Sequence, residues 1–185
     1  MKITITGPRS IGKTTISKLV AKKLGLEYIS TDEIGEEVFK KHGGLDKAMK
    51  SGIVEESIKK GGYGRITNIY ETKDNFVFDL SGGSFSSDKL PEATEKVRNC
   101  AKKHSIIVGL LPSENSEESI KLLFEREKER PHFKEMDKKE LMEKTIRSFN
   151  RFPPLFEKFC NLVIYTKGKT PDKIANEIVK SLAGK

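Results

Sequence analysis

The stretch Gly7-Pro8-Arg9-Ser10-Ile11-Gly12-Lys13-Thr14 decides the fold, because it fits the pattern Gly-x-x-x-x-Gly-Lys-Thr. Residues 2–6 before it alternate in polarity and favour a β-strand, and residues 12–24 after it repeat apolar side chains at helical spacing. A loop of this kind between a strand and a helix turns backbone N–H groups towards phosphate, and the helix N-terminus adds a favourable potential. The order of strand, loop and helix therefore predicts a P-loop that binds a nucleotide.

This loop contains groups suited to a triphosphate and its metal ion. We expect the segment from Gly7 to Thr15 to hold the phosphates of ATP, with Lys13 between the β- and γ-phosphates and the Thr14 hydroxyl on Mg²⁺. Magnesium also needs a carboxylate at the end of a neighbouring strand. Asp79 is the first candidate, because it ends an apolar run and ligands bind at the carboxyl edge of such sheets. Asp32 is the alternative.

Short apolar segments alternate with helical patterns along the rest of the chain. The predicted strands are residues 2–6, 26–29, 75–80, 105–111 and 161–166, and the predicted helices are 12–24, 32–41, 45–60, 91–103, one from residue 116 and one from residue 170. This alternation predicts an α/β fold with a five-stranded parallel sheet sandwiched by helices. The chain has 185 residues and no low-complexity linker, so we expect residues 1–185 to form a single domain.

The composition restricts the partners of the chain. Charged residues make up 34% and the formal net charge is +8, but Lys and Glu are intermixed along the helices. This argues against nucleic acid as the main partner and fits a polyanionic small ligand. No run of about 18 apolar residues predicts a membrane span. Cys100 and Cys160 lack metal-ligand spacing and suit reduced thiols, so we expect a cytoplasmic protein, and no pattern specifies its oligomeric state.

Beyond the P-loop, the order of landmarks resembles the shikimate kinase family over nearly the whole chain. Tyr28-Ile29-Ser30-Thr31-Asp32 is similar to the family's Asp-x-Asp segment, and Ser81-Gly82-Gly83-Ser84 is similar to its Gly-Gly-Gly turn. The most specific stretch, Arg126-Glu127-Lys128-Glu129-Arg130-Pro131-His132-Phe133, resembles the family's lid. Asn150-Arg151-Phe152-Pro153-Pro154-Leu155-Phe156-Glu157 resembles the family's Arg-x-Pro-Leu-Tyr segment. The resemblance implies a P-loop NTPase of the nucleoside monophosphate kinase and shikimate kinase type, with a lid at residues 125–135.

The resemblance also implies roles at the acceptor. Asp32 would accept hydrogen bonds from acceptor hydroxyls and act as base or orienter, while Gly82 and Gly83 would lie behind the acceptor. Arg151 would hold an acceptor carboxylate, which suits the planar fork of a guanidinium group. Arg65 is the nearest match to a second carboxylate-binding arginine of the family, although the residues around it differ.

In the lid, the resemblance implies that Arg130 stabilises charge on the transferring phosphoryl group and that Arg126 stacks on adenine. The two arginines stand four residues apart among glutamates, so an ordinary charged helix surface is the alternative. Four phenylalanines follow at helical spacing, which predicts core packing beneath the lid: Phe149, Phe152, Phe156 and Phe159.

One departure from the family concerns the magnesium ligands. Ser30 stands in place of the first acid of the Asp-x-Asp segment, while Asp79 stands where the family has a small or uncharged residue. We interpret this as a transfer of the acid to the adjacent strand. The changed turn at Gly82 and Gly83 and the changed surroundings of Arg65 leave open an acceptor other than shikimate.

These observations predict an ATP-dependent kinase that moves the γ-phosphoryl group to a hydroxyl of a small polar acceptor, shikimate or a similar polyhydroxy acid. One alternative is a nucleoside monophosphate kinase or ATPase of the adenylate kinase type, in which the arginines would bind a second phosphate. The other is a nucleotide-sensing or assembly module that binds ATP without phosphoryl transfer.

Overall fold

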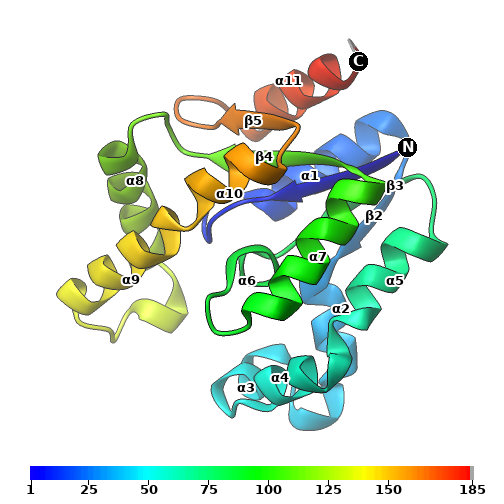
Figure 1. The fold of residues 1–185 in the computed structure, drawn as a ribbon. Helices are drawn as coiled ribbons and strands as arrows, with labels where there is room; N and C mark the ends of the chain where they lie inside the picture. The colour runs from blue at the N-terminus through cyan, green and yellow to red at the C-terminus, as the bar shows by residue number, and fades with distance from the viewer. Residues whose placement is uncertain (184–185) are drawn as a thin grey trace.

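The structure is a computed structural model that describes residues 1–183, apart from the side chain of His132. Five parallel strands form one sheet in the order β2-β3-β1-β4-β5 (Figure 1). They are β1 Lys2–Thr6, β2 Glu27–Ser30, β3 Phe76–Asp79, β4 Ile106–Leu111 and β5 Leu162–Tyr165. The prediction of a five-stranded parallel sheet is confirmed, and its strands lie within a residue or two of the predicted bounds.

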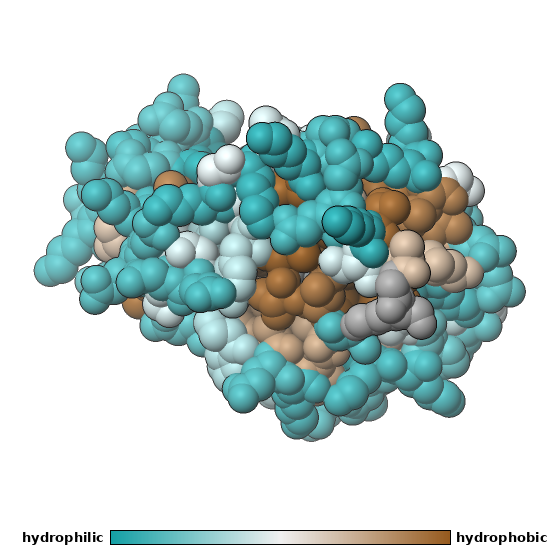
Figure 2. Space-filling view, turned by 90° about the horizontal axis from the view of Figure 1, so that it is seen from above, coloured by the Kyte–Doolittle hydropathy of each residue, from teal (hydrophilic) through white to brown (hydrophobic). Residues whose placement is uncertain are grey.

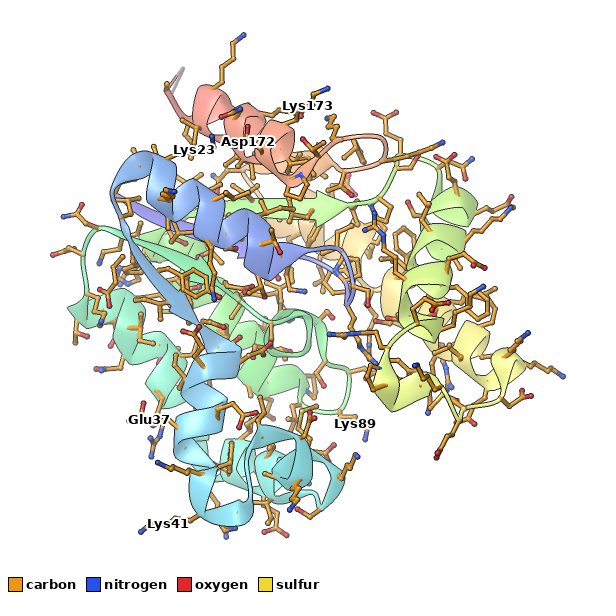
Figure 3. The ribbon with its side chains drawn as sticks, turned by 180° about the vertical axis from the view of Figure 1, so that it is seen from behind. Lys23, Glu37, Lys41, Lys89, Asp172 and Lys173 are labelled. Atoms are coloured by element: carbon orange, nitrogen blue, oxygen red, sulfur yellow. The ribbon has the colours of Figure 1, made fainter. Side chains whose placement is uncertain are left out.

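Helices cover both faces of the sheet (Figure 1). On one face lie α1 (Lys13–Leu24) and α11 (Pro171–Ala183), which are joined by an ion pair of 2.7 Å between Lys23 Nζ and Asp172 Oδ1 (Figure 3). On the other face lie α5 (Gly64–Thr72), α7 (Pro91–His104) and α10 (Phe152–Phe159). The strands between these layers are buried, as near-continuous apolar runs in a parallel sheet require.

Two groups of helices extend from the carboxyl edge of the sheet (Figure 1). The first comprises α2 (Thr31–Val38), the 3₁₀ turn η1 (Lys40–His42), α3 (Leu45–Lys50), α4 (Ile53–Ser57) and the π-helical turn η2 (Ile58–Gly62). The second comprises α8 (Ser116–Lys128), the 3₁₀ turn η3 (Pro131–Phe133) and α9 (Lys138–Asn150). Between the groups lies the short helix α6 (Gly82–Ser86). Within residues 1–183, no helix is both long and apolar enough to cross a membrane.

The core places α10 tightly against β4. A Cβ atom added to Gly109 would lie 2.5 Å from Cδ2 of Phe156 and 3.0 Å from Sγ of Cys160. Only glycine lets the helix approach this closely, because real Cβ contacts are longer. The surface, by contrast, is mostly hydrophilic, and apolar residues show mainly in the centre of the face in Figure 2. Most apolar residues therefore lie in the contacts between the helices and the sheet.

Some helices differ from the prediction. The helix expected at residues 45–60 is divided between α3 and α4, because Gly52 adopts a positive φ angle. Helix α4 runs on into η2, which contains a second glycine with a positive φ angle, Gly61. Helices α5 and α9 were not predicted, since glycines precede α5 and charged residues dominate α9. The four phenylalanines are all buried, as predicted, but they belong to two helices, α9 and α10, which meet at Arg151.

Candidate active site

The P-loop joins β1 to α1 and has an unusual backbone at two places. Gly12 has φ 97°, which glycine adopts freely, but Ser10 has φ 61°, a region that costs energy for a residue with a Cβ atom. The Ser10 hydroxyl is also buried and has no hydrogen-bond partner among the described residues. Lys13 folds its side chain back over the loop, since Nζ donates to the Pro8 carbonyl at 3.1 Å.

Asp79 lies at the carboxyl edge of the sheet beside the P-loop. The sheet register pairs it with Ile5 on β1 and with Ser30 on β2, so the acid stands opposite the serine that we expect to replace the family's acid. Asp79 is 3% exposed. Asp79 Oδ2 accepts hydrogen bonds from the Thr14 hydroxyl at 2.8 Å and from the Tyr28 hydroxyl at 3.2 Å. The register therefore provides the neighbouring position that a transfer of the acid between strands requires.

Three titratable groups at this edge have shifted pKa values. Burial lowers the pKa of Lys13, and the nearby Asp79 and Asp32 carboxylates only partly oppose this shift. Asp32 is exposed at the mouth of the site, yet desolvation by the surrounding protein raises its pKa, and the Asp79 charge adds to the rise. Burial raises the pKa of Tyr28 to about 12, so its hydroxyl keeps the proton that it donates to Asp79. Shifted groups of this kind often mark functional sites.

Helix α2 begins at Thr31 directly after β2, and Asp32 lies in its first turn. The Ser30 side chain caps this helix, because its Oγ accepts from the Asp32 backbone N–H at 3.2 Å. Thr31, between Ser30 and Asp32, connects the ends of β2 and β3. Its hydroxyl donates to the Asp79 carbonyl at 3.2 Å and accepts from the Ser81 N–H at 2.8 Å. The segment after β2 is therefore fixed to the segment after β3.

The turn after β3 lies against the P-loop. A Cβ atom on Gly82 would stand 2.8 Å from the Gly7 carbonyl oxygen and 3.1 Å from the Phe152 ring, so a glycine is needed there. Gly83, next to it, is exposed. The turn thus brings together the P-loop, α6 and the start of α10, the helix that follows Arg151.

The residues expected to form a lid approach the P-loop from the other side. Arg126 Nη1 donates to the Ser10 carbonyl at 3.3 Å, and Arg130 is near enough for its charge to oppose protonation of Lys13 and favour ionisation of Asp32. Beside them is a cavity of about 250 Å³. Its lining comes from the P-loop with α1, from α8, and from α11 with the segment before it: Ser10, Ile11, Gly12, Thr15, Ile16, Arg126, Thr166, Lys169, Pro171 and Ile174.

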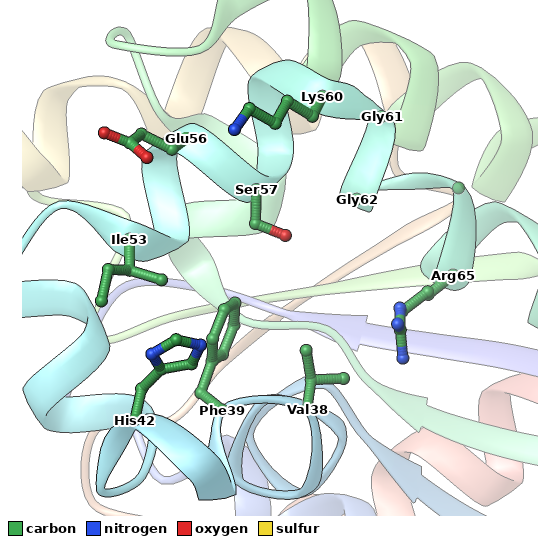
Figure 4. Close-up of a pocket in the computed structure, with 11 residues that line it drawn as sticks. Val38, Phe39, His42, Ile53, Glu56, Ser57, Lys60, Gly61, Gly62 and Arg65 are labelled. Carbon is green, nitrogen blue, oxygen red and sulfur yellow. The ribbon is translucent and has the colours of Figure 1, made fainter.

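The two arginines expected at the acceptor lie in different places. Arg151 Nη1 bonds to Asp88 Oδ1 at 2.6 Å, and Asp88 lies in the loop after α6. Arg65 lines a separate cavity of about 640 Å³ between α2, α4, η2 and α5, where Glu56, Ser57 and Lys60 face Val38, Phe39 and His42 (Figure 4). Of the described residues, none of the other predicted acceptor residues lines this cavity. The structure therefore does not bring Arg65 together with Asp32, Gly82 and Arg151.

Several contacts of this site were not predicted from the sequence. Tyr28 and Thr31 both bond to Asp79, and Glu127 and the side chain of Arg9 connect the P-loop to α8. The contacts of Tyr28 and Thr31 depend on the register of β2 and β3, which pairs the nearby Ser30 with Asp79. Within the described residues, no three His, Cys, Asp or Glu side chains cluster as a metal site.

Comparison with known proteins identifies the family. The sequence profile of the family "Shikimate kinase" matches residues 9–183. Shikimate kinase of Bacillus subtilis is 30% identical over 191 aligned residues, which cover 97% of this chain and 88% of the relative. Among solved structures, shikimate kinase of Aquifex aeolicus has a TM-score of 0.72 at 22% identity, covering 100% of this chain and 97% of that one. Shikimate kinase of Acinetobacter baumannii in complex with shikimate has a TM-score of 0.67 at 21% identity, covering 99% and 93%. The chain therefore belongs to the shikimate kinase family and is an ATP-dependent phosphotransferase that acts on an alcohol group.

Proposed function

We propose that this protein transfers the γ-phosphoryl group of Mg-ATP to a hydroxyl of shikimate. One observation carries the proposal: Asp32 lies within the electrostatic influence of Lys13, Asp79 and Arg130. An acceptor hydroxyl bonded to Asp32 would therefore lie beside the groups suited to bind the γ-phosphate. The curated relatives named shikimate kinase and the solved complex with shikimate support this acceptor.

At the nucleotide, Lys13 would bind the β- and γ-phosphates and the backbone from Gly7 to Thr15 would donate N–H groups to them. The small cavity beside Ser10 is suited to the base, with Arg126 and Pro171 in its lining. The Thr166 hydroxyl in the same lining is buried and without a partner among the described residues, so it is free to bond a polar edge of the base.

Thr14 and Asp79 fit a magnesium ion. Their oxygens lie 2.8 Å apart, close to the separation of about 3.0 Å between adjacent oxygen ligands of an octahedral Mg²⁺. The remaining ligands would be phosphate oxygens and water, as is usual for this ion. Bound there, Mg²⁺ would neutralise charge on the phosphates.

At the acceptor, Asp32 would accept a hydrogen bond from the attacking hydroxyl and take its proton as the bond to phosphorus forms. Gly82 and Gly83 would lie behind the acceptor, and Arg151 would bind its carboxylate after leaving Asp88. Arg130 would stabilise the charge on the transferred group. We further infer that residues 1–185 act as a single kinase domain with a lid at residues 125–135, which would exclude water as a competing acceptor.

A neutral polyhydroxy acceptor is the second candidate. Asp88 already occupies Arg151, and Arg65 lies in another cavity, so fewer cations face the acceptor than an anionic substrate would favour. In this case Asp32 would still bind the attacking hydroxyl, while Arg151 would have a structural role.

Coupled ADP release with Mg-ATP distinguishes these proposals. The matched acceptors are shikimate and its uncharged methyl ester, followed by other polyhydroxy acids, sugars and nucleoside monophosphates. We expect stimulation by shikimate and a much weaker response to the ester. Equal responses would favour the neutral acceptor, and a response to nucleoside monophosphates alone would refute both.

A further inference from the structure

The P-loop and the end of α8 hold each other through two arginines that reach in opposite directions. Arg9 extends from the P-loop towards α8, with its Nε 3.9 Å from Glu127 Oε1, and Arg126 extends from α8 to the Ser10 carbonyl. The guanidinium carbon of Arg9 also lies 4.9 Å from the centroid of the Phe133 ring, in a cation–π geometry. Arg9 therefore contacts residues on both sides of the turn between α8 and η3.

The contact of Arg9 with Glu127 differs from a surface ion pair, because the carboxylate is buried. Its side chain is 5% exposed, and its other oxygen accepts a hydrogen bond of 2.8 Å from the Thr145 hydroxyl on α9. A buried carboxylate needs a compensating cation. Arg9 lies within ion-pair distance of it in the part of the chain that the structure describes. Glu127 thus connects the P-loop, α8 and α9 at one point.

We propose that Arg9 is a positioning residue, whose side chain holds the lid through Glu127 and Phe133 so that Arg130 stays over the phosphate site. Arg130 stands between these two contacts in the chain, and its N–H donates to the Glu127 carbonyl at 3.0 Å. Phosphate binding by the P-loop uses backbone N–H groups, which leaves the Arg9 side chain for the lid. We refer to Arg9, Glu127 and Phe133 as the lid clasp.

A fluorescence experiment tests the clasp without substrate. The chain contains no tryptophan, so Phe133→Trp provides a single indole that keeps an aromatic ring over Arg9. In this background, Arg9→Met and Glu127→Gln should each shift the emission to the red and increase its quenching by acrylamide. The matched control is Glu125→Gln, which removes the same charge from an exposed position of α8 that pairs with Lys128. Unchanged emission in Arg9→Met would overturn the proposal whatever the acceptor is.

A kinetic cycle separates positioning from simple stability. With an acceptor that stimulates ADP release, each single variant should lower kcat by roughly tenfold with a smaller change in the KM for ATP, since misplacing one catalytic group costs rate rather than binding. The double variant should be no slower than the slower single, because both remove one contact.

Thermal denaturation completes this cycle. Arg9→Met leaves a buried charge without its cation, so adding Glu127→Gln should raise the melting temperature of that variant while kcat stays low. Two results would count against a positioning role: effects on kcat that multiply in the double variant, or a kcat that recovers together with stability.

Discussion

The nucleotide and acceptor sides of the site are built differently. On the nucleotide side, Lys13 and Thr14 belong to one loop, and Asp79 is brought beside them by the register of neighbouring strands. On the acceptor side, the expected residues come from four separate segments. One of them, Arg151, is paired with Asp88, and another, Arg65, lines a different cavity. The nucleotide half is preformed by the P-loop and the strand register, whereas the acceptor half depends on how distant helices meet.

The largest expected effect concerns the preformed half. Lys13→Ala should lower kcat by roughly 10³-fold or more, because it removes the positive charge proposed to bind the β- and γ-phosphates. Its folded-state pKa is lowered by burial, so the charged lysine opposes folding and its removal should not reduce the melting temperature at neutral pH. Coupled ADP release and thermal denaturation measure both effects. Lys22→Ala, an exposed position on α1, is the control, and near-normal turnover in Lys13→Ala would refute the site.

The next prediction concerns Asp32, where the nucleotide and acceptor halves of the site meet. Asp32→Asn should lower kcat by roughly 10²- to 10⁴-fold, the range for losing a general base. In the wild type, kcat/KM should fall as the pH drops through the Asp32 pKa, which lies above the ordinary carboxyl value, and the variant should lack this limb.

The raised pKa of Asp32 also predicts how Asp32→Asn changes stability. A raised folded-state pKa means that ionised Asp32 opposes folding above that pKa, so Asp32→Asn should raise the melting temperature at pH 7. A pH profile identical to the wild type would remove Asp32 from the chemistry.

A smaller effect separates Asp79 from Ser30, the two positions between which the acid of the metal site is proposed to have moved. Asp79→Asn should lower kcat by about 10²-fold and raise the Mg²⁺ concentration needed for half-maximal rate, because it loses a charged ligand. Ser30→Ala removes only a helix cap and should leave the Mg²⁺ dependence unchanged. Titrations of rate against Mg²⁺ measure the difference. Equal, mild effects in both variants would contradict the transfer of the acid to β3.

The acceptor half should respond more weakly. Asp88→Asn frees Arg151, so the KM for an anionic acceptor should fall by about 1.5- to 5-fold, since an exposed ion pair is worth only about 0.2–1 kcal/mol. Steady-state kinetics with shikimate and its methyl ester measure this, and the KM for the ester should not change. A rise in the KM for shikimate would instead mean that Asp88 orients Arg151 productively.

The smallest effect is on stability alone. Ser10→Gly should stabilise the fold by about 0.5–1 kcal/mol, because glycine tolerates φ 61° and removes a buried hydroxyl without a described partner. Denaturant unfolding measures the change. Ser51→Gly, at φ −86°, gains no such relief and should be destabilising. A loss of stability in Ser10→Gly would show that the serine makes a contact that outweighs its backbone cost.

The contrast between the two halves also explains what the sequence could predict. The P-loop, the five strands and the acid at the end of β3 follow from contiguous patterns, because strand, loop and helix signals act over a few residues. Arg151 and Asp88 are 63 residues apart, and their pairing depends on the angle between α9 and α10. The contact of Arg9 with Glu127 joins two charged residues that each fit a solvated surface in the sequence. Such pairs depend on tertiary packing, which no local pattern records.

Gly109 on β4 affects how variants of this protein would be classified. Gly109 lets α10 rest on the sheet, and Arg151 stands at the first turn of that helix. A side chain at position 109 would lift the helix and carry the arginine with it. If Arg151 binds the acceptor as proposed, such a change would register in a genetic screen as a defect in substrate preference, although the altered residue lies in the interior. Variation in specificity would then arise from the middle of the sheet, far from any residue that a binding assay would single out.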